Sequence, residues 1–143
     1  MTALVDGWIA LLLQENGPLV RLRATWPMLV NEAFRESAGG RAAFDAWALV
    51  AATVQGSSLS YVARGMNQFD LRRRLSAIRV PVLAIAGEHD RLFSPDASVE
   101  INREIVGSSY AVIQGAGHLS NLDSPDQFNR LVLDFLATHF PMI

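Results

Sequence analysis

The chain has 143 residues, of which half are hydrophobic and 18% are charged, and its formal net charge is −2. This composition is typical of one folded domain, or of part of a larger one, and excludes a disordered chain. Its only basic cluster, residues 72–74, adjoins Asp70 on a short helical segment, which is typical of a solvated face, so we expect no nucleic-acid partner.

The first part of the chain has the hydrophobic spacing of helices and shows no strand before residue 80. Pro27 should kink or divide the second helix, because a proline removes a backbone donor and clashes with the preceding turn. Helices are predicted over residues 3–15, from residue 18 onward, and over 41–55 and 58–68, with a loop at 37–40. We expect residues 1–68 to form a helical, cap-like region.

From residue 69 onward the pattern alternates between helices and short apolar runs of strand length. Runs of this kind are typical of parallel strands buried on both faces, and a strand–helix–strand unit is right-handed. The predicted elements are a helix over 70–78 with Asp70 as N-cap, a strand over 82–87, a helix over 95–106, a strand over 109–114, and a helix over 125–139. Ser124 should cap the last helix, which should bury Phe128, Leu131, Val132, Phe135 and Leu136. Residues 69–143 therefore read as an α/β lobe.

Asp90 follows the first predicted strand in the run Gly87-Glu88-His89-Asp90. A carboxylate at the carboxyl end of a strand can accept the ring N–H of a histidine on the neighbouring loop and fix its tautomer. It can equally cap the turn that leads into Ser94 and Pro95. The sequence leaves both interpretations open.

His118 follows the second predicted strand, 28 residues after Asp90, in the run Gly115-Ala116-Gly117-His118. The two glycines free the backbone to bend sharply, and the carboxyl ends of parallel strands meet at one edge of a sheet. An isolated histidine is more often exposed or packed in the core, but this context favours a catalytic pair with Asp90. His89, His139 and Glu88 are weaker candidates.

The chain lacks several features that other kinds of site require. It has no cysteine, which excludes a disulfide framework, a thiolate zinc site and a cysteine nucleophile. No His and acidic residues follow a metal-ligand spacing such as H-E-x-x-H, so we expect no metal and no cofactor. The apolar run at residues 8–13 is too short to cross a bilayer and lacks the basic flank of a signal peptide. We expect a cytoplasmic protein without a membrane partner.

A nucleophile is not evident among the serines that precede Asp90. A hydrolase with an acid and a base in this order uses a serine in the elbow motif G-x-S-x-G, which none of these serines matches. The closest run, Gly56-Ser57-Ser58-Leu59-Ser60, has serine in place of the second glycine. The chain thus contains a base and its orienting acid without the group that they would activate.

These motifs resemble the carboxyl-terminal part of the α/β-hydrolase family, and most of all enzymes of the 3-oxoadipate enol-lactonase type. The residues that carry the resemblance are Asp70-Leu71-Arg72, Ile78 to Leu83, Ala86 to Asp90, Gly115 to Pro125, Phe128, and Leu133 to Leu136. The resemblance implies that Asp90 is the triad acid and His118 the general base. Residues 1–68 resemble the helical cap of the same family.

The resemblance implies a serine-type hydrolase of a small-molecule ester or lactone, inactive as an isolated chain. The apolar edge of the first strand needs a partner, so we expect a fragment of a longer hydrolase, a second polypeptide that supplies the nucleophile half, or self-association. An acyl pocket could be lined by Trp26, Met28, Phe34, Phe44 and Trp47, although ordinary cap packing also explains them. The alternative function is a non-catalytic α/β-hydrolase-like module for binding or dimerisation.

Overall fold

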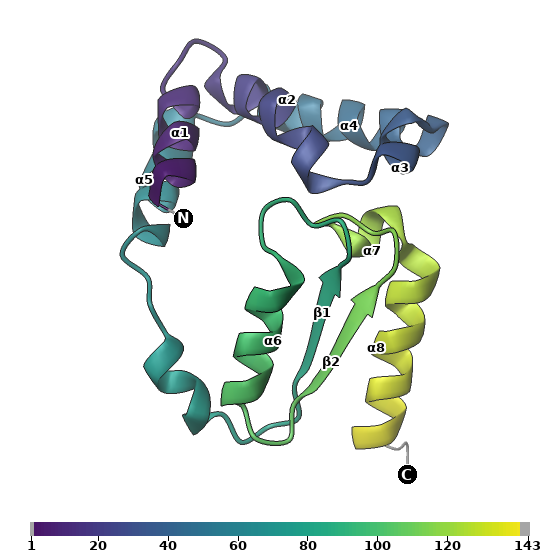
Figure 1. The fold of residues 1–143 in the computed structure, drawn as a ribbon. Coiled ribbons are helices and arrows are strands. Elements are labelled where there is room, and N and C mark those ends of the chain that lie inside the picture. The colour runs from purple at the N-terminus through teal and green to yellow at the C-terminus, as the bar shows by residue number, and fades with distance from the viewer. Residues whose placement is uncertain (1, 141–143) are drawn as a thin grey trace. The chain divides into compact units, whose positions relative to one another are not determined.

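The computed structural model describes residues 2–140, and the chain divides into two compact units. One unit contains the residues up to Pro27 together with Arg35–Asp70, and the other contains Met28–Phe34 together with the chain from Leu71 onward. The elements, labelled in Figure 1, are α1 (Thr2–Leu12), α2 (Gly17–Leu29), α3 (Glu32–Glu36), α4 (Ala38–Ala51), α5 (Gly56–Met66), the 3₁₀ helix η1 (Arg72–Ala77), β1 (Leu83–Gly87), α6 (Pro95–Glu104), β2 (Ser109–Ile113), α7 (Ser120–Asp123) and α8 (Pro125–His139).

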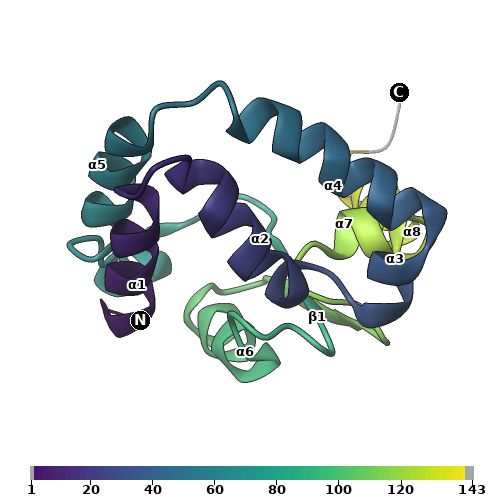
Figure 2. The same ribbon diagram turned by 90° about the horizontal axis from the view of Figure 1, so that it is seen from above.

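The first unit is helical throughout its described residues, as the sequence predicts. Helices α1 and α5 lie side by side (Figures 1 and 2). Val5, Trp8 and Leu12 are buried along one side of α1, because residues three or four apart share a helix face. Hydrophobic burial of this face holds the helix pair together.

A cluster of three aromatic rings joins α2 to α4 within the same unit. The ring of Trp26 lies 5.6 Å from that of Phe44 and 5.8 Å from that of Trp47, in edge-to-face geometry in both cases. Trp26 is only 5% exposed. Edge-to-face packing places the positive edge of one ring against the negative face of another, so the three rings pack α2 against α4 around the buried Trp26.

The second unit is built on the parallel pair β1 and β2, in which Leu83 is opposite Ser109 and Gly87 is opposite Ile113. The two strands and the following helix α8 confirm the predicted positions to within a residue at each end. Helices α6 and α8 both contact the strands and flank them (Figure 1). Ile113 is almost completely buried, so the core of this unit lies at the carboxyl ends of the strands.

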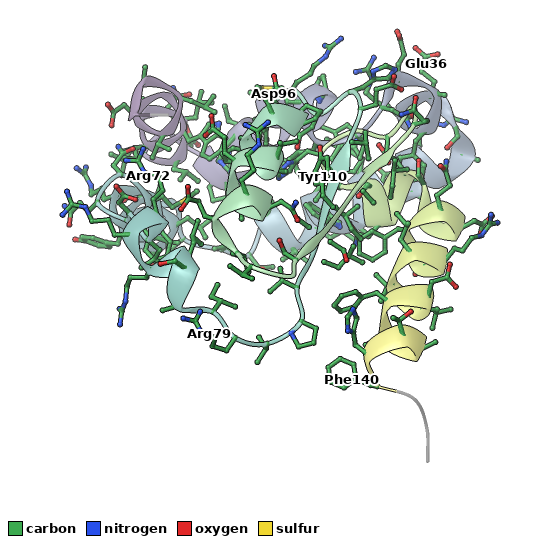
Figure 3. The ribbon with its side chains drawn as sticks, turned by 60° about the horizontal axis from the view of Figure 1, so that its bottom comes forward. Glu36, Arg72, Arg79, Asp96, Tyr110 and Phe140 are labelled. Atoms are coloured by element: carbon green, nitrogen blue, oxygen red, sulfur yellow. The ribbon has the colours of Figure 1, made fainter. Side chains whose placement is uncertain are left out.

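Burial in this unit is lower than the sequence suggests. Leu83, Ala84 and Ile85 are only half-buried, because β1 has a single strand neighbour within residues 2–140. The prediction that α8 buries Leu136 is wrong, since this side chain is 44% exposed, whereas the other four apolar residues predicted there are half-buried. Figure 3 shows Phe140, also exposed, just beyond the end of α8.

Two local predictions also require correction, those for residues 37–40 and 70–78. The predicted loop at 37–40 is wrong, because Ser37 Oγ accepts the amide of Gly40 and α4 begins at Ala38; this N-cap outweighs the low helix propensity of the glycines. Helix α2 contains Pro27 and continues to Leu29. The predicted helix at 70–78 is a shorter 3₁₀ helix with Leu71, instead of Asp70, at its N-cap position. Ser124 occupies the N-cap position of α8 without a side-chain capping bond.

Candidate functional site

The carboxyl ends of β1 and β2 lie at the same edge of the sheet, and two loops follow from them. We call residues 88–94 the acid loop and residues 114–119 the histidine loop. His118 Nδ1 lies 2.8 Å from Asp90 Oδ2. The Asp90 side chain is 8% exposed and that of His118 is 29% exposed. The structure therefore brings the two predicted residues into direct contact, with the histidine ring partly open to solvent.

The two carboxylate oxygens of Asp90 have different partners. Oδ1 accepts the backbone amides of Leu92 at 2.8 Å and Phe93 at 3.0 Å, while Oδ2 faces the histidine. Asp90 thus caps its own turn and also contacts His118, so the structure contains the contacts on which both interpretations depend. Because Oδ1 is anchored to two amides, Oδ2 has a defined direction toward the imidazole.

This contact determines which nitrogen of His118 carries the proton. An ionised carboxylate only accepts hydrogen bonds, so we assign the proton of the neutral ring to Nδ1. Nε2 then has a free lone pair and can take a proton from a nearby hydroxyl or water. The Phe93 ring packs beside the imidazole at a centroid distance of 5.6 Å, which restricts rotation of the ring. The arrangement is suited to general acid–base chemistry.

Backbone hydrogen bonds connect the acid loop to the histidine loop. The amide of Glu88 donates to the Ile113 carbonyl at 3.0 Å, and the amide of His89 donates to the Ala116 carbonyl at 2.8 Å. The Glu88 side chain accepts the amide of Gly115 at 2.8 Å. Glu88, a weaker candidate for the acid itself, thus helps to hold the histidine loop.

Two positions in the histidine loop require glycine, each for a different reason. Gly115 has φ of +72°, a left-handed conformation that favours glycine. Gly117 has no such conformation; a β-carbon there would lie 2.9 Å from both the Asn31 amide nitrogen and Asp123 Oδ2. Its glycine is needed for close packing and not for a sharp bend, which corrects the reason inferred from the sequence.

The remaining candidates do not join this pair. His89 is exposed, and its Nε2 lies 3.9 Å from Glu88 Oε2. His139 is exposed at the end of α8, where its ring packs against Phe135. Among residues 2–140, no group of three or more His, Cys, Asp or Glu side chains could hold a metal ion. In the same part of the chain, no helix combines the length and apolar character needed to cross a membrane.

The five residues predicted to line a substrate pocket fall into both compact units. Trp26, Phe44 and Trp47 are brought together, but as the aromatic core of the first unit. Met28 and Phe34 belong to the second unit. The three rings contact one another, and the assignment of the five residues to a substrate pocket stays a prediction.

The serine run nearest to an elbow motif lies at the start of a helix. Gly56 begins α5, and Ser60 is buried with its hydroxyl donating to the Ser57 carbonyl at 2.7 Å. No strand precedes α5 among the described residues, whereas an elbow serine sits on a strand-to-helix turn. The local geometry therefore differs from that of a nucleophile.

Sequence reasoning missed several contacts of the site. No sequence motif indicates that Phe93 packs against the His118 ring. The close approach of Gly87 to the backbone of Ala116 and Gly117 arises only when the folded chain brings these segments together. Asn31 and Asp123 both contact the histidine loop. Asp123 lies in the motif run after His118 and could have been singled out there, whereas Asn31 is 84 residues from its partner Gly115 and no local pattern indicates it.

Known proteins provide independent comparisons. The family model described as "Alpha/beta hydrolase family" matches residues 2–131. A 2-hydroxy-6-oxononadienedioate/2-hydroxy-6-oxononatrienedioate hydrolase of Pseudomonas putida is 38% identical over 76 residues, which make up 52% of this chain and 27% of that protein. A proline iminopeptidase of Lactobacillus helveticus is 26% identical over 125 residues, or 87% of this chain and 38% of the relative.

Solved structures contain the same fold. The crystal structure of the enol-lactonase from Burkholderia xenovorans LB400 superposes with a TM-score of 0.83 at 24% identity, covering 92% of this chain and 49% of that one. The chain spans less than half the length of each of these three proteins. Its two parallel strands with flanking helices correspond to the carboxyl-terminal part of that fold. The chain belongs to the α/β-hydrolase family.

Proposed function

We propose that this chain supplies the acid and the base of a serine-type α/β-hydrolase that cleaves a small-molecule ester or lactone. Asp90 is the triad acid and His118 the general base. The observation that carries the proposal is the 2.8 Å contact between Asp90 Oδ2 and His118 Nδ1 at the carboxyl edge of the sheet. Parallel α/β folds hold their chemistry at this edge.

The proposed reaction uses the free Nε2 of His118 in both half-reactions. Nε2 takes the proton of a serine hydroxyl as the oxygen attacks the substrate carbonyl, and then donates that proton to the leaving alcohol. In the second half-reaction Nε2 takes a proton from the water that attacks the acyl carbonyl, and then donates that proton to the serine oxygen as the acyl–serine bond breaks and the acid product leaves. Asp90 stabilises the imidazolium that forms in each step, and its own anchoring to two amides holds it in position.

The nucleophile and the oxyanion hole, in this proposal, come from polypeptide outside these 143 residues. Two observations support this. The sequence contains no G-x-S-x-G motif, and the chain covers only about half of the enol-lactonase that it superposes on. The outer edge of β1, which has no strand partner within residues 2–140, is where a complementary hydrolase half would pair. We propose such a half, in the same polypeptide or in a separate one, and not a second copy of this chain, because a second copy would bring no elbow serine.

The proposed substrate class rests on the structural likeness to an enol-lactonase. The two relatives named above have names that refer to different substrates, and the family uses a serine, a histidine and an acid for acyl transfer in general. Esters and lactones both present a carbonyl for attack and an alkoxide to protonate. A p-nitrophenyl ester and a simple γ-lactone therefore serve as test substrates.

The decisive experiment produces the chain with its nucleophile half and assays p-nitrophenyl acetate. We expect His118→Ala to lower kcat by roughly 10⁴-fold or more, since triad residues act as a unit. His89→Ala is the matched control, because this exposed histidine in the acid loop should leave the rate unchanged. Full activity in the His118→Ala protein would contradict the proposal. If fluorophosphonate labels neither the chain nor any protein that copurifies with it from its own cell, the non-catalytic module becomes the better explanation.

A further inference from the structure

The backbone on both sides of His118 is held by a segment distant in sequence. The amide of Leu119 donates to the Leu29 carbonyl at 2.7 Å. Asn31 Nδ2 donates to the Gly115 carbonyl at 3.0 Å, while Asn31 Oδ1 accepts the amide of Phe34 at 2.7 Å. These bonds explain why Met28–Phe34 belongs to the second compact unit and not to the helical one.

One carboxylate, that of Asp123, joins this segment to the histidine loop. Its Oδ2 accepts the amide of Gly117 and the amide of Asn31, both at 2.8 Å. Helix α7 directs the side chain back to the loop, because the Leu119 carbonyl accepts the amides of Leu122 and Asp123 and so closes a tight turn. The peptide group between Ala116 and Gly117, one residue before His118, is thereby bonded to a charged acceptor.

The carboxylate is held in an environment that is costly for it. Asp123 Oδ1 is buried and has no hydrogen-bond partner among the described residues. A buried polar atom without a partner loses its hydration and gains nothing in return. Charge-assisted hydrogen bonds at Oδ2 offset the lost hydration of Oδ1. An apolar contact could join the two segments without burying a carboxylate oxygen at all. Unlike an apolar contact, the carboxylate fixes the orientation of both segments, because one oxygen, Oδ2, accepts an amide from each of them.

We propose that Asp123 is a positioning residue for His118. Its bond to the Gly117 amide sets the plane of the Ala116–Gly117 peptide group, and the Leu119 amide, in the peptide group that follows His118, is held by the Leu29 carbonyl. With the backbone fixed on both sides, the His118 ring keeps its Nδ1 contact with Asp90 Oδ2. This inference rests on the proposed role of His118 as the base, and it adds a residue that touches neither the ring nor the substrate.

Nuclear magnetic resonance of the chain labelled with ¹⁵N tests the inference without any need for activity. The ring ¹⁵N shifts of His118 report its tautomer, and the Nδ1–H proton bonded to a carboxylate gives a far-downfield signal. In Asp123→Ala we expect that signal to be lost and the Nδ1–H tautomer to become mixed with Nε2–H. Asp126→Ala, an exposed acid in the first turn of α8, is the matched control and should leave the His118 spectrum unchanged.

Asp123→Asn is the conservative variant and protects the test against a failure to fold. An asparagine oxygen still accepts two amides, but more weakly because it is neutral. We expect the His118 signal to persist while the amide protons of Gly117 and Asn31 both move upfield. The inference is overturned if the two amide protons do not move in Asp123→Asn. It is also overturned if folded Asp123→Ala keeps the wild-type His118 signal, even with a lower melting temperature, because the role would then be only structural.

In the protein assembled with its nucleophile half, the same variants separate the two proposals. Misplacement of the base by about 1 Å costs roughly 100-fold in rate. We expect Asp123→Ala to lower kcat by about that factor with KM unchanged, and Asp123→Asn to restore most of the rate. If His118→Ala is fully active, the proposed function fails, whereas the spectroscopic result on Asp123 is unaffected.

Discussion

Gly87 and Gly117 approach each other so closely that a β-carbon on Gly87 would lie 2.0 Å from the Gly117 carbonyl oxygen. The end of β1 therefore contacts the backbone of the histidine loop directly, with no side chain between them. The same β-carbon would lie 2.6 Å from the Ala116 carbonyl oxygen. Since both obstacles are backbone atoms, neither can rotate away.

Gly87→Ala should therefore push the histidine loop away from the acid loop. We expect the free energy of unfolding to fall by about 1–3 kcal/mol, the usual cost of overpacking. Urea denaturation followed by circular dichroism measures this change, and the His118 ring shifts report the displacement.

Gly65→Ala provides the control for that substitution. Gly65 lies in α5, and a β-carbon there would meet nothing within 4 Å. We expect this variant to gain about 0.5–1 kcal/mol, because alanine loses less backbone entropy in a helix. An unchanged stability in Gly87→Ala would show that the loop contact does not constrain the fold.

Asp90→Asn should change the tautomer of His118 while keeping the turn. The asparagine oxygen can still accept the amides of Leu92 and Phe93, which places the NH₂ group opposite Nδ1. Because that group donates, Nδ1 must accept, and the ring proton moves to Nε2. Ring ¹⁵N shifts distinguish the two forms. In the assembled hydrolase we expect a loss of kcat on the order of 10⁴-fold; an Nδ1–H tautomer that persists in Asp90→Asn would contradict our assignment.

Trp26→Ala should remove the aromatic core between α2 and α4. A buried tryptophan costs about 3–5 kcal/mol when truncated to alanine, and we expect Trp47→Ala to cost less because Trp47 is 43% exposed. A double-mutant cycle between Trp26 and Phe44, read by circular dichroism, should give a coupling of about 0.5–1.5 kcal/mol. A coupling near zero would mean that the edge-to-face contact adds nothing to hydrophobic burial.

Tyr110 should make the free energy of unfolding fall as the pH rises into the alkaline range. Burial, and to a smaller extent the negative charge of Asp96, raise the pKa of Tyr110 above its ordinary value of 10.0. Figure 3 labels both residues, and the phenol also donates to the Pro95 carbonyl at 3.1 Å. The native state thus keeps this proton to higher pH than the unfolded chain does. The resulting stability is fully present below about pH 10 and is lost as the pH rises through the folded-state pKa.

Tyrosinate absorbance measures this shift once the other tyrosine is removed. In a Tyr61→Phe background we expect a titration midpoint above 10, and a lower midpoint when Asp96→Asn is added. Stability curves of wild type and Tyr110→Phe should converge as the pH rises above 10. A midpoint at or below 10 would show that Tyr110 is not desolvated.

Local pattern alone indicated most of the elements of the second unit and both members of the acid–base pair. The apolar runs around residues 82–87 and 109–114 have strand length, and parallel order places their carboxyl ends together. Asp90 and His118 follow those ends, so their contact is a consequence of chain order. The start of α4 was mispredicted because a single Ser37 capping bond reversed the propensity of two glycines.

By itself, the sequence determined most of the elements and the parallel order of the two strands, and it favoured the pairing of Asp90 with His118, because hydrophobic periodicity and turn chemistry act between near neighbours. The tertiary structure alone decided how the histidine is held. Asn31 and Asp123 are 92 residues apart, Gly87 meets Gly117 across two loops, and the segment Met28–Phe34 leaves the helical unit to pack with the second one. Hydrogen bonds and steric limits of this kind depend on atoms that only the folded chain brings together, so no local pattern encodes them.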